Sequence, residues 1–169
     1  MVEASSYDVA VVGAGPGGYV AAIRAAQLGL RVVLIEREEL GGVCLNHGCI
    51  PSKTLLHTAE IVAAIRNDGE RLGITFDALH LDFGRAVDSS REVVAKLRDG
   101  IGILLKQNKV EVLTGTARLE SATTLRLEPD GQLVEASNVV LATGARAAAF
   151  PGVTLDGERV FTSREALEL

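Results

Sequence analysis

The 169-residue chain contains two cysteines, Cys44 and Cys49, which stand five residues apart. Pro51 and Lys53 follow closely, and this pattern predicts a helix that begins just after the pair. The partial positive charge of a helix N-terminus favours a thiolate over a thiol. Two cysteines of which one is activated in this way can form a reversible dithiol/disulfide couple. We therefore predict that this segment is a redox centre.

The spacing of the two cysteines limits the backbone between them. Five residues of regular α-helix rise about 7.5 Å, whereas a disulfide rarely tolerates Cα atoms more than about 7 Å apart. If Cys44 and Cys49 form a disulfide, the intervening segment is not a plain helix, and Gly48 is the expected site of distortion. Two alternatives stay open at this point. One is a pair of buried, inert cysteines, and the other is a metal site that adds His47 or His57, although structural zinc usually takes four ligands at tighter spacings.

A glycine-rich turn precedes the cysteines and joins two expected elements. Tyr7–Val12 is an apolar, β-branched run that predicts a buried strand. It leads directly into Gly13-Ala14-Gly15-Pro16-Gly17-Gly18. A helix is expected over 21–28, and a second strand over 31–35 ends at Glu36. A G-x-G-x-x-G motif in this setting, with an acid 18 residues after its last glycine, predicts a dinucleotide-binding βαβ unit.

Each part of this motif has a separate expected role. Gly13 forms the tight turn, Gly15 lets a pyrophosphate approach the backbone, and Gly18 allows the helix to pack closely on the strand. The helix N-terminus attracts the phosphates. Glu36 is expected to accept hydrogen bonds from a ribose hydroxyl, which disfavours a 2′-phosphate at that position.

Two further helices are expected after the cysteines. One is opened by Pro51 and continues through Arg66. The other is capped by Asp82 and covers 83–107. Its expected apolar stripe consists of Val94, Leu97, Ile101 and Leu104.

The second half of the chain predicts short strands. A strand is expected over 110–113, followed by three antiparallel strands over 117–119, 125–127 and 133–136, with a hairpin turn at Asp130-Gly131. A further buried strand over 139–142 ends at Thr143-Gly144, where a cofactor can touch the backbone. Thr162 and Glu165 form the pattern of a capping box at the start of a last helix.

Composition argues against several classes of function. The chain is 47% apolar with a formal net charge of −5, which fits one domain with a real core. Mild acidity without basic patches argues against nucleic acid or an anionic membrane as a partner. The apolar runs are of strand length, far short of a membrane span. Two cysteines do not make a secreted disulfide scaffold and the N-terminus lacks a signal region, so we expect a cytoplasmic protein.

The glycine-rich turn, Glu36, the run Gly41-Gly42-Val43-Cys44-Leu45-Asn46-His47-Gly48-Cys49-Ile50-Pro51-Ser52-Lys53 and the run Ala142-Thr143-Gly144 together resemble the flavin disulfide reductases. The residues after the second cysteine are most similar to those of the dihydrolipoamide dehydrogenase or mercuric reductase families. The resemblance implies an α/β fold: a Rossmann-like FAD-binding domain whose parallel sheet carries helices and a three-stranded antiparallel β-meander. It implies that residues 1–145 form this domain and that 146–169 are a linker toward an NAD-binding domain. The chain is accordingly expected to be an N-terminal fragment, inactive alone.

The same resemblance implies roles for individual residues. Cys49 would be the thiolate that faces the flavin and forms a charge-transfer complex with it, and Cys44 would be the interchange thiol that reacts with the substrate sulfur. Lys53 would lie near the flavin N5, Glu36 would hold the adenosine ribose, and Arg37 would lie close to the adenine. The remaining cofactor contacts are expected from Gly13, Ala14, Gly15, Pro16, Gly17, Gly18, Gly41, Gly42, Val43, Ala117, Ala142, Thr143 and Gly144.

Some positions depart from the family pattern. Val43 stands where a threonine is usual, so one hydroxyl contact to the flavin would be missing, and Ala145 replaces a frequent serine. The chain also lacks the NAD domain and the His–Glu pair that supplies a base from the partner subunit. Without such a pair, thiol exchange would lose its general base.

The function that the resemblance implies is oxidation of dihydrolipoamide by NAD⁺, with electrons passing through the Cys44–Cys49 disulfide and FAD. No metal is expected. The implied partners are lipoyl-bearing components of 2-oxoacid dehydrogenase complexes, and the intact enzyme would be a homodimer that binds NAD. The alternatives are a mercuric or other thiol–disulfide reductase, and an FAD-binding module without catalytic activity.

Overall fold

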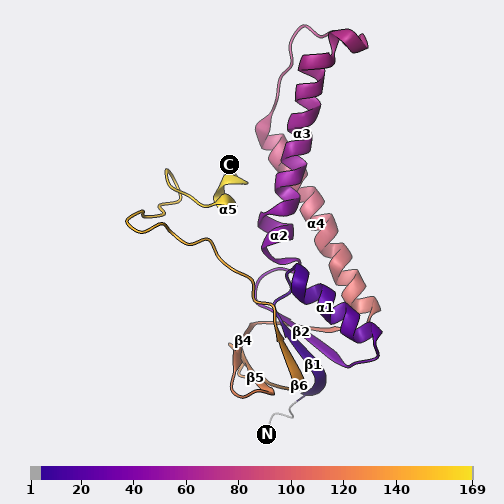
Figure 1. Ribbon diagram of the computed structural model, residues 1–169, viewed down its shortest axis with the longest axis vertical. Helices are drawn as coiled ribbons and strands as arrows, with labels where there is room; N and C mark the ends of the chain where they lie inside the picture. The colour runs from indigo at the N-terminus through magenta and orange to yellow at the C-terminus, as the bar shows by residue number, and fades with distance from the viewer. Residues whose placement is uncertain (1–4, 169) are drawn as a thin grey trace. The chain divides into compact units, whose positions relative to one another are not determined.

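The computed structural model describes residues 5–168, which divide into two compact units (Figure 1). The first unit contains the described residues up to Asn46 together with Leu97–Arg146, and the second contains His47–Lys96 together with the described residues from Ala147 onward. The first unit carries the sheet, and the second is mainly helical.

The first unit is built on one six-stranded sheet with the strand order β3-β2-β1-β6-β5-β4. Its strands are β1 (Ser5–Val12), β2 (Val32–Glu36), β3 (Glu111–Thr114), β4 (Thr116–Leu119), β5 (Thr124–Glu128) and β6 (Leu133–Leu141). The neighbours from β3 to β6 pair in parallel, and β6, β5 and β4 pair antiparallel. The predicted combination of a parallel Rossmann-like sheet and an antiparallel meander is therefore confirmed.

One detail of the predicted strands is wrong. The segments 133–136 and 139–142 were expected as two strands, but they are one continuous strand, β6. It pairs in parallel with β1 from Val134 to Leu141 and antiparallel with β5 from Leu133 to Glu135. The meander and the parallel sheet thus share β6, because one strand can use its two edges for two different partners.

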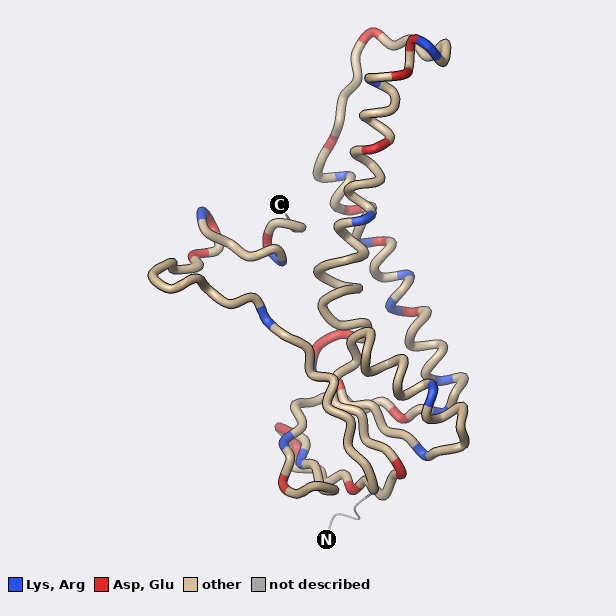
Figure 2. The backbone as a smooth tube through the Cα atoms, in the orientation of Figure 1, with Lys and Arg blue, Asp and Glu red and all other residues tan. Residues whose placement is uncertain are grey.

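The centre of the sheet is buried on both faces. Ala10 and Val11 of β1 and Val33 and Leu34 of β2 have no exposed surface, as expected for parallel strands that read as continuous apolar runs. The buried core cluster of the sheet consists of Tyr7, Ala10, Val12, Val33, Ile35, Leu125, Leu127, Val134 and Ala136. The β4–β5 hairpin also carries ion pairs: Arg118 Nε lies 2.6 Å from Glu128 Oε1, and Arg126 is bonded to Glu120. Figure 2 shows basic and acidic positions close together on the backbone of this hairpin.

Helix α1 (Pro16–Gln27) begins within the glycine-rich turn, so that the last three residues of that run are its first turn. The sequence placed its start at residue 21, five residues late, although proline at the first helical position is a recognised start signal. The helix ends as expected just before Gly29, whose φ of +87° is a left-handed conformation.

The expected helices of the second unit are present, but the helix predicted to start after the cysteine pair begins at Cys49 itself. They are α3 (Cys49–Asp68), η1 (Glu70–Leu72), α5 (Ser163–Ala166) and the part of α4 (Phe83–Gln107) that precedes Leu97. Helix α4 has the predicted bounds, and Asp82 Oδ1 accepts a hydrogen bond from Arg85 N at 3.1 Å. The predicted stripe is half right, because Val94 and Ile101 are buried while Leu97 and Leu104 are exposed. Among the described residues no helix is long and apolar enough to cross a membrane.

Candidate functional site

The glycine-rich turn lies between β1 and α1 and is packed too tightly for side chains at two positions. Gly13 has φ +100°, and a Cβ there would lie 2.3 Å from the carbonyl oxygen of Ala142. A Cβ at Gly18 would lie 1.7 Å from the carbonyl oxygen of Gly13. Backbone atoms cannot yield as a flexible side chain can, so packing within this unit alone requires glycine at both positions.

Gly15 and Gly17 are different, because nothing in the described structure lies within 4 Å of a Cβ built on either of them. Gly15 has φ −66° and ψ −179°, a conformation that any residue adopts, and it is the N-cap of α1. Neither backbone strain nor packing explains glycine at Gly15. The backbone is open on this side of the turn, at the positive end of a helix, and both properties suit a phosphate group.

Glu36 ends β2 beside the same turn. Its Oε2 accepts a hydrogen bond from Ala14 N at 2.7 Å, and its Oε1 accepts from Arg37 N and Glu38 N at 2.8 Å each. A carboxylate has about four acceptor positions, so three backbone bonds fix the group and leave capacity for one more donor. The carboxylate of Glu36, which is predicted to bind a ribose hydroxyl, is thus held in a fixed orientation at the end of β2.

The redox segment starts directly on the glycine-rich turn, within the first unit. Gly41 N donates to Ala14 O at 2.8 Å. A Cβ at Gly42 would lie 2.7 Å from Gly15 Cα. Helix α2 (Gly42–His47) then begins. The glycine-rich turn and the cysteine segment, which the sequence presents as two separate motifs, are therefore in contact through their backbones.

Asn46, for which no role was predicted, stabilises the backbone at the start of this segment. It is 2% exposed, and its Nδ2 donates to the carbonyl oxygens of Leu40 and Gly42 at 3.0 Å each. A buried amide is stable only with such partners. No spacing or composition pattern in the sequence marks this residue.

The two cysteines are joined by a disulfide. Gly48, with φ −148° and ψ −105°, separates α2 from α3, so the predicted distortion at this residue is confirmed. The alternative of two inert, buried thiols is wrong, because the sulfurs are bonded and Cys49 is exposed, while Cys44 is half-buried. Among the described residues, no group of three or more metal-binding side chains is arranged to hold an ion.

Helix α3 positions Cys49 and Lys53. Cys49 is its first residue, and Lys53 stands four residues later. This spacing puts the two side chains on one face of the helix, and both residues are exposed. A sulfur at the first residue of a 20-residue helix lies at the positive end of the helix dipole.

The remaining predicted contact residues lie in the first unit. Ala142 N donates to Val12 O at 2.8 Å, and this bond brings the end of β6, with Thr143 and Gly144 after it, to the glycine-rich turn. Ala117 lies on β4, and the nearby Gly115 N donates to Glu36 O at 2.9 Å. The other two predicted contacts are solvent-facing: Arg37 is exposed and lies 3.6 Å from Glu38 Oε1, and Val43 is 60% exposed.

A shallow groove in the same unit contains none of the predicted site residues. It lies between the loop of Glu38, Glu39 and Leu40 and the later part of α4, and the ion-paired Arg98 and Glu39 are among its lining residues. Both signs of charge line it, so it favours no ligand of a single charge.

Comparisons with known proteins agree with these motifs. The family description of pyridine nucleotide-disulphide oxidoreductases matches residues 7–169. Dihydrolipoyl dehydrogenase of Zymomonas mobilis is 44% identical over 168 residues, which is 98% of this chain and 36% of that protein. Dihydrolipoyl dehydrogenase of Bacillus subtilis is 41% identical over 177 residues, with 98% and 37% covered. The chain thus spans about a third of the length of the curated relatives it matches.

A solved structure gives the same result for the fold. The HOCl-induced flavoprotein disulfide reductase RclA from Escherichia coli is 31% identical and superposes with a TM-score of 0.78, over 96% of this chain and 34% of RclA. Sequence, fold and the paired cysteines all agree, and the chain belongs to the pyridine nucleotide-disulphide oxidoreductase family.

Proposed function

We propose that this chain forms the FAD-binding and dithiol-exchanging part of a dihydrolipoyl dehydrogenase, which oxidises dihydrolipoamide and reduces NAD⁺. The observation that carries the proposal is the backbone contact of Gly41 and Gly42 with the glycine-rich turn. This contact starts the redox segment on the surface that is suited to a dinucleotide phosphate. Relatives with the name dihydrolipoyl dehydrogenase support the choice of substrate.

The residues of the first unit fit a flavin dinucleotide. The open backbone at Gly15 and Gly17 would receive the pyrophosphate at the N-terminus of α1. Glu36, held by three backbone amides, would accept one hydrogen bond from the ribose of the adenosine. The chemistry that FAD supplies when bound is the transfer of two electrons between a dithiol pair and a nicotinamide.

The disulfide performs the exchange with the substrate. A substrate thiolate attacks Cys44 Sγ, a mixed disulfide forms, and Cys49 leaves as a thiolate. The second thiol of the substrate then attacks the mixed disulfide, so that the substrate leaves as a cyclic disulfide and Cys44 as a thiol. Two electrons move from the substrate to the protein, and the two substrate protons are released to the reduced pair or to water.

The side chains and the helix of the second unit favour one sulfur as the leaving group. Cys49 lies at the first residue of α3, where the helix dipole stabilises a thiolate. Lys53 on the same helix face adds a positive charge one turn away. A more acidic thiol is the better leaving group in exchange, which supports Cys44 as the sulfur that meets the substrate.

The wider assembly belongs to the same proposal. The whole protein would bind NAD, act as a homodimer, and receive its substrate from lipoyl-bearing components of 2-oxoacid dehydrogenase complexes. A couple that cycles between disulfide and dithiol works in a reducing compartment, which favours the cytoplasm.

Reaction of the FAD-loaded protein with dihydrolipoamide under nitrogen tests this function. We expect two protein thiols to appear per chain and the flavin absorbance to change, with neither event in Cys44→Ser. Glutathione, a monothiol, is the comparison substrate, because it cannot leave as a cyclic disulfide. Equal rates with both thiols would favour a general disulfide reductase, the class named for RclA. Flavin binding without any thiol formation would identify a non-catalytic module and would contradict the proposal.

A further inference from the structure

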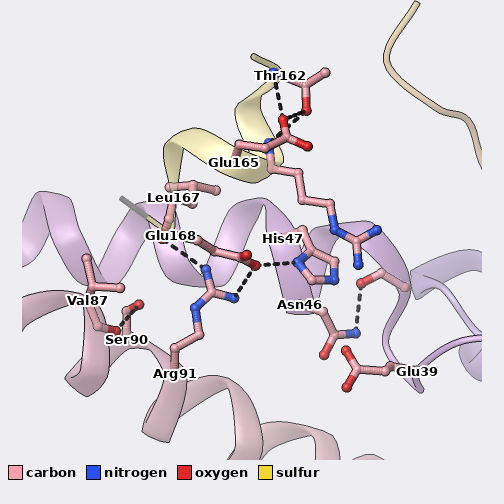
Figure 3. Close-up of polar contacts among 12 residues, drawn as sticks. Glu39, Asn46, His47, Val87, Ser90, Arg91, Thr162, Glu165, Leu167 and Glu168 are labelled. Atoms are coloured by element: carbon pink, nitrogen blue, oxygen red, sulfur yellow. Dashed lines mark hydrogen bonds and ion pairs between the residues drawn. The ribbon is translucent and has the colours of Figure 1, made fainter. Parts of the chain in front are cut away.

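A cluster of charged side chains holds the residue that ends α2, within the second unit. His47 stands between the two cysteines in the sequence and directly before Gly48. Its side chain is 14% exposed, and its Nδ1 lies 3.4 Å from Glu168 Oε1 (Figure 3). The two atoms are at ion-pair distance, and the pair carries opposite charges when the imidazole is protonated.

Arg91 on α4 holds Glu168 in turn. Its Nη1 lies 3.7 Å from Glu168 Oε1, and its Nη2 donates to Leu167 O at 3.1 Å (Figure 3). One guanidinium therefore binds both the side chain of Glu168 and the backbone next to it. The segment is further ordered by α5, which begins with a capping box of Thr162 and Glu165.

We propose that Glu168 is a positioning residue for the Cys44–Cys49 couple: by holding the His47 imidazole, it favours the backbone turn at Gly48 that the disulfide requires. Arg91 fixes Glu168 for this task. The inference rests on the proposed function only in taking Cys44–Cys49 as the redox couple.

The physical reason lies in the geometry of the segment. Continuous helix from Cys44 to Cys49 would separate the two Cα atoms by about 7.5 Å, beyond the usual reach of a disulfide. Gly48 can adopt many conformations once the bond is broken. An anchored His47 removes some of these conformations, so the two sulfurs meet more often and the disulfide becomes harder to reduce.

The expected size follows from the exposure of the contact. Half-exposed ion pairs and hydrogen bonds of this kind have modest strength, and only the part that differs between the disulfide and dithiol forms counts. We expect that loss of the contact changes the disulfide equilibrium by about three- to fivefold towards the dithiol. For a two-electron couple this corresponds to about 15 to 20 mV.

The test equilibrates the purified chain with defined ratios of reduced and oxidised dithiothreitol at pH 7, followed by acid quenching and counting of thiols by a mass-shifting maleimide. Glu168→Gln and His47→Gln should each favour the dithiol by about three- to fivefold, and the double variant should show no more than either single variant. Glu60→Gln is the matched control, because it breaks the exposed His57–Glu60 contact on α3 in the same way. It should leave the equilibrium unchanged.

Thermal unfolding of the oxidised and reduced forms separates positioning from a general loss of stability. Glu168→Gln should lower the melting temperature of the disulfide form more than that of the dithiol form. Equal lowering of both, additive single variants, or a shift no larger than that of Glu60→Gln would each overturn the inference. None of these measurements needs flavin or dihydrolipoamide, so a failure of the proposed function and a failure of this inference are seen in different experiments.

Discussion

Replacing Gly15 by alanine adds one methyl group to the surface that we assign to the pyrophosphate. Nothing within the described structure lies within 4 Å of the new Cβ, and φ of −66° suits alanine. The substitution therefore probes the ligand surface without disturbing the packing of the fold.

The expected effects on stability and on binding are of very different size. Alanine restricts the unfolded chain and adds about 0.4–1 kcal/mol of stability, while alanine is a poorer N-cap than glycine by a similar amount. The unfolding free energy should thus change by less than about 0.5 kcal/mol. A methyl group in the path of the phosphate would cost one hydrogen bond to a charged group, about 1.5–3 kcal/mol, which is about a 10- to 100-fold loss of FAD affinity.

Two measurements on the same protein check this prediction. Thermal unfolding without ligand reports stability, and quenching of flavin fluorescence during a titration reports affinity. If Gly15→Ala folds like the wild type and binds FAD equally well, the pyrophosphate does not approach this turn. If Gly15→Ala is unfolded without ligand, other atoms of the protein occupy the space into which the new methyl group points.

Three further substitutions test other parts of the structure. Gly18→Ala should lose about 3 kcal/mol or more of stability even without ligand, because its Cβ would lie 1.7 Å from Gly13 O; chemical denaturation measures this, and a loss below 1 kcal/mol would contradict the packing. Asn46→Ala should cost about 2–3 kcal/mol through two lost backbone hydrogen bonds in a buried site, again by denaturation. The pKa of Asp156 is lowered by hydrogen bonds from backbone amides, the largest from Val160. Because this pKa is lowered, the hydrogen bonds of Asp156 stabilise the turn from Asp156 to Val160 fully above the ordinary aspartate pKa of about 3.9. This stabilisation is lost as the pH falls through the lowered pKa of Asp156 in the folded protein. The amide resonance of Val160 should shift with this titration, and the shift should be absent in Asp156→Asn.

Local signals predicted some elements almost to the residue. Helix α4 has its predicted bounds because Asp82 caps its first turn, and the capping box of Thr162 and Glu165 begins α5 as expected. The break at Gly48 followed from the reach of a disulfide, if Cys44 and Cys49 form one, and from the conformational freedom of glycine. In each case the information lies within a few neighbouring residues.

Features that depend on distant partners were missed. The sequence divided β6 at Ser137-Asn138, because two polar residues interrupt its apolar pattern. In the structure, β1 pairs with β6 on both sides of Ser137, and Asn138 Nδ2 donates to Asp8 O at 3.3 Å. The contact of Glu168 with His47 joins residues that are 121 positions apart in the sequence. No periodicity or spacing rule reports such a contact in a single sequence.

The visible spectrum of the FAD-loaded protein during stepwise reduction by a dithiol tests the central claim most directly. A flavin close to the Cys49 thiolate should develop a long-wavelength absorption at about two electrons per chain. This absorption should be absent in Cys49→Ser. In Cys44→Ser, which has no disulfide and retains the Cys49 thiolate, it should be present before any dithiol is added and should not grow when the dithiol is added. Reduction of the disulfide with no new absorption, in a protein that demonstrably holds FAD, would show that the sulfur pair and the flavin are not neighbours and would contradict the account.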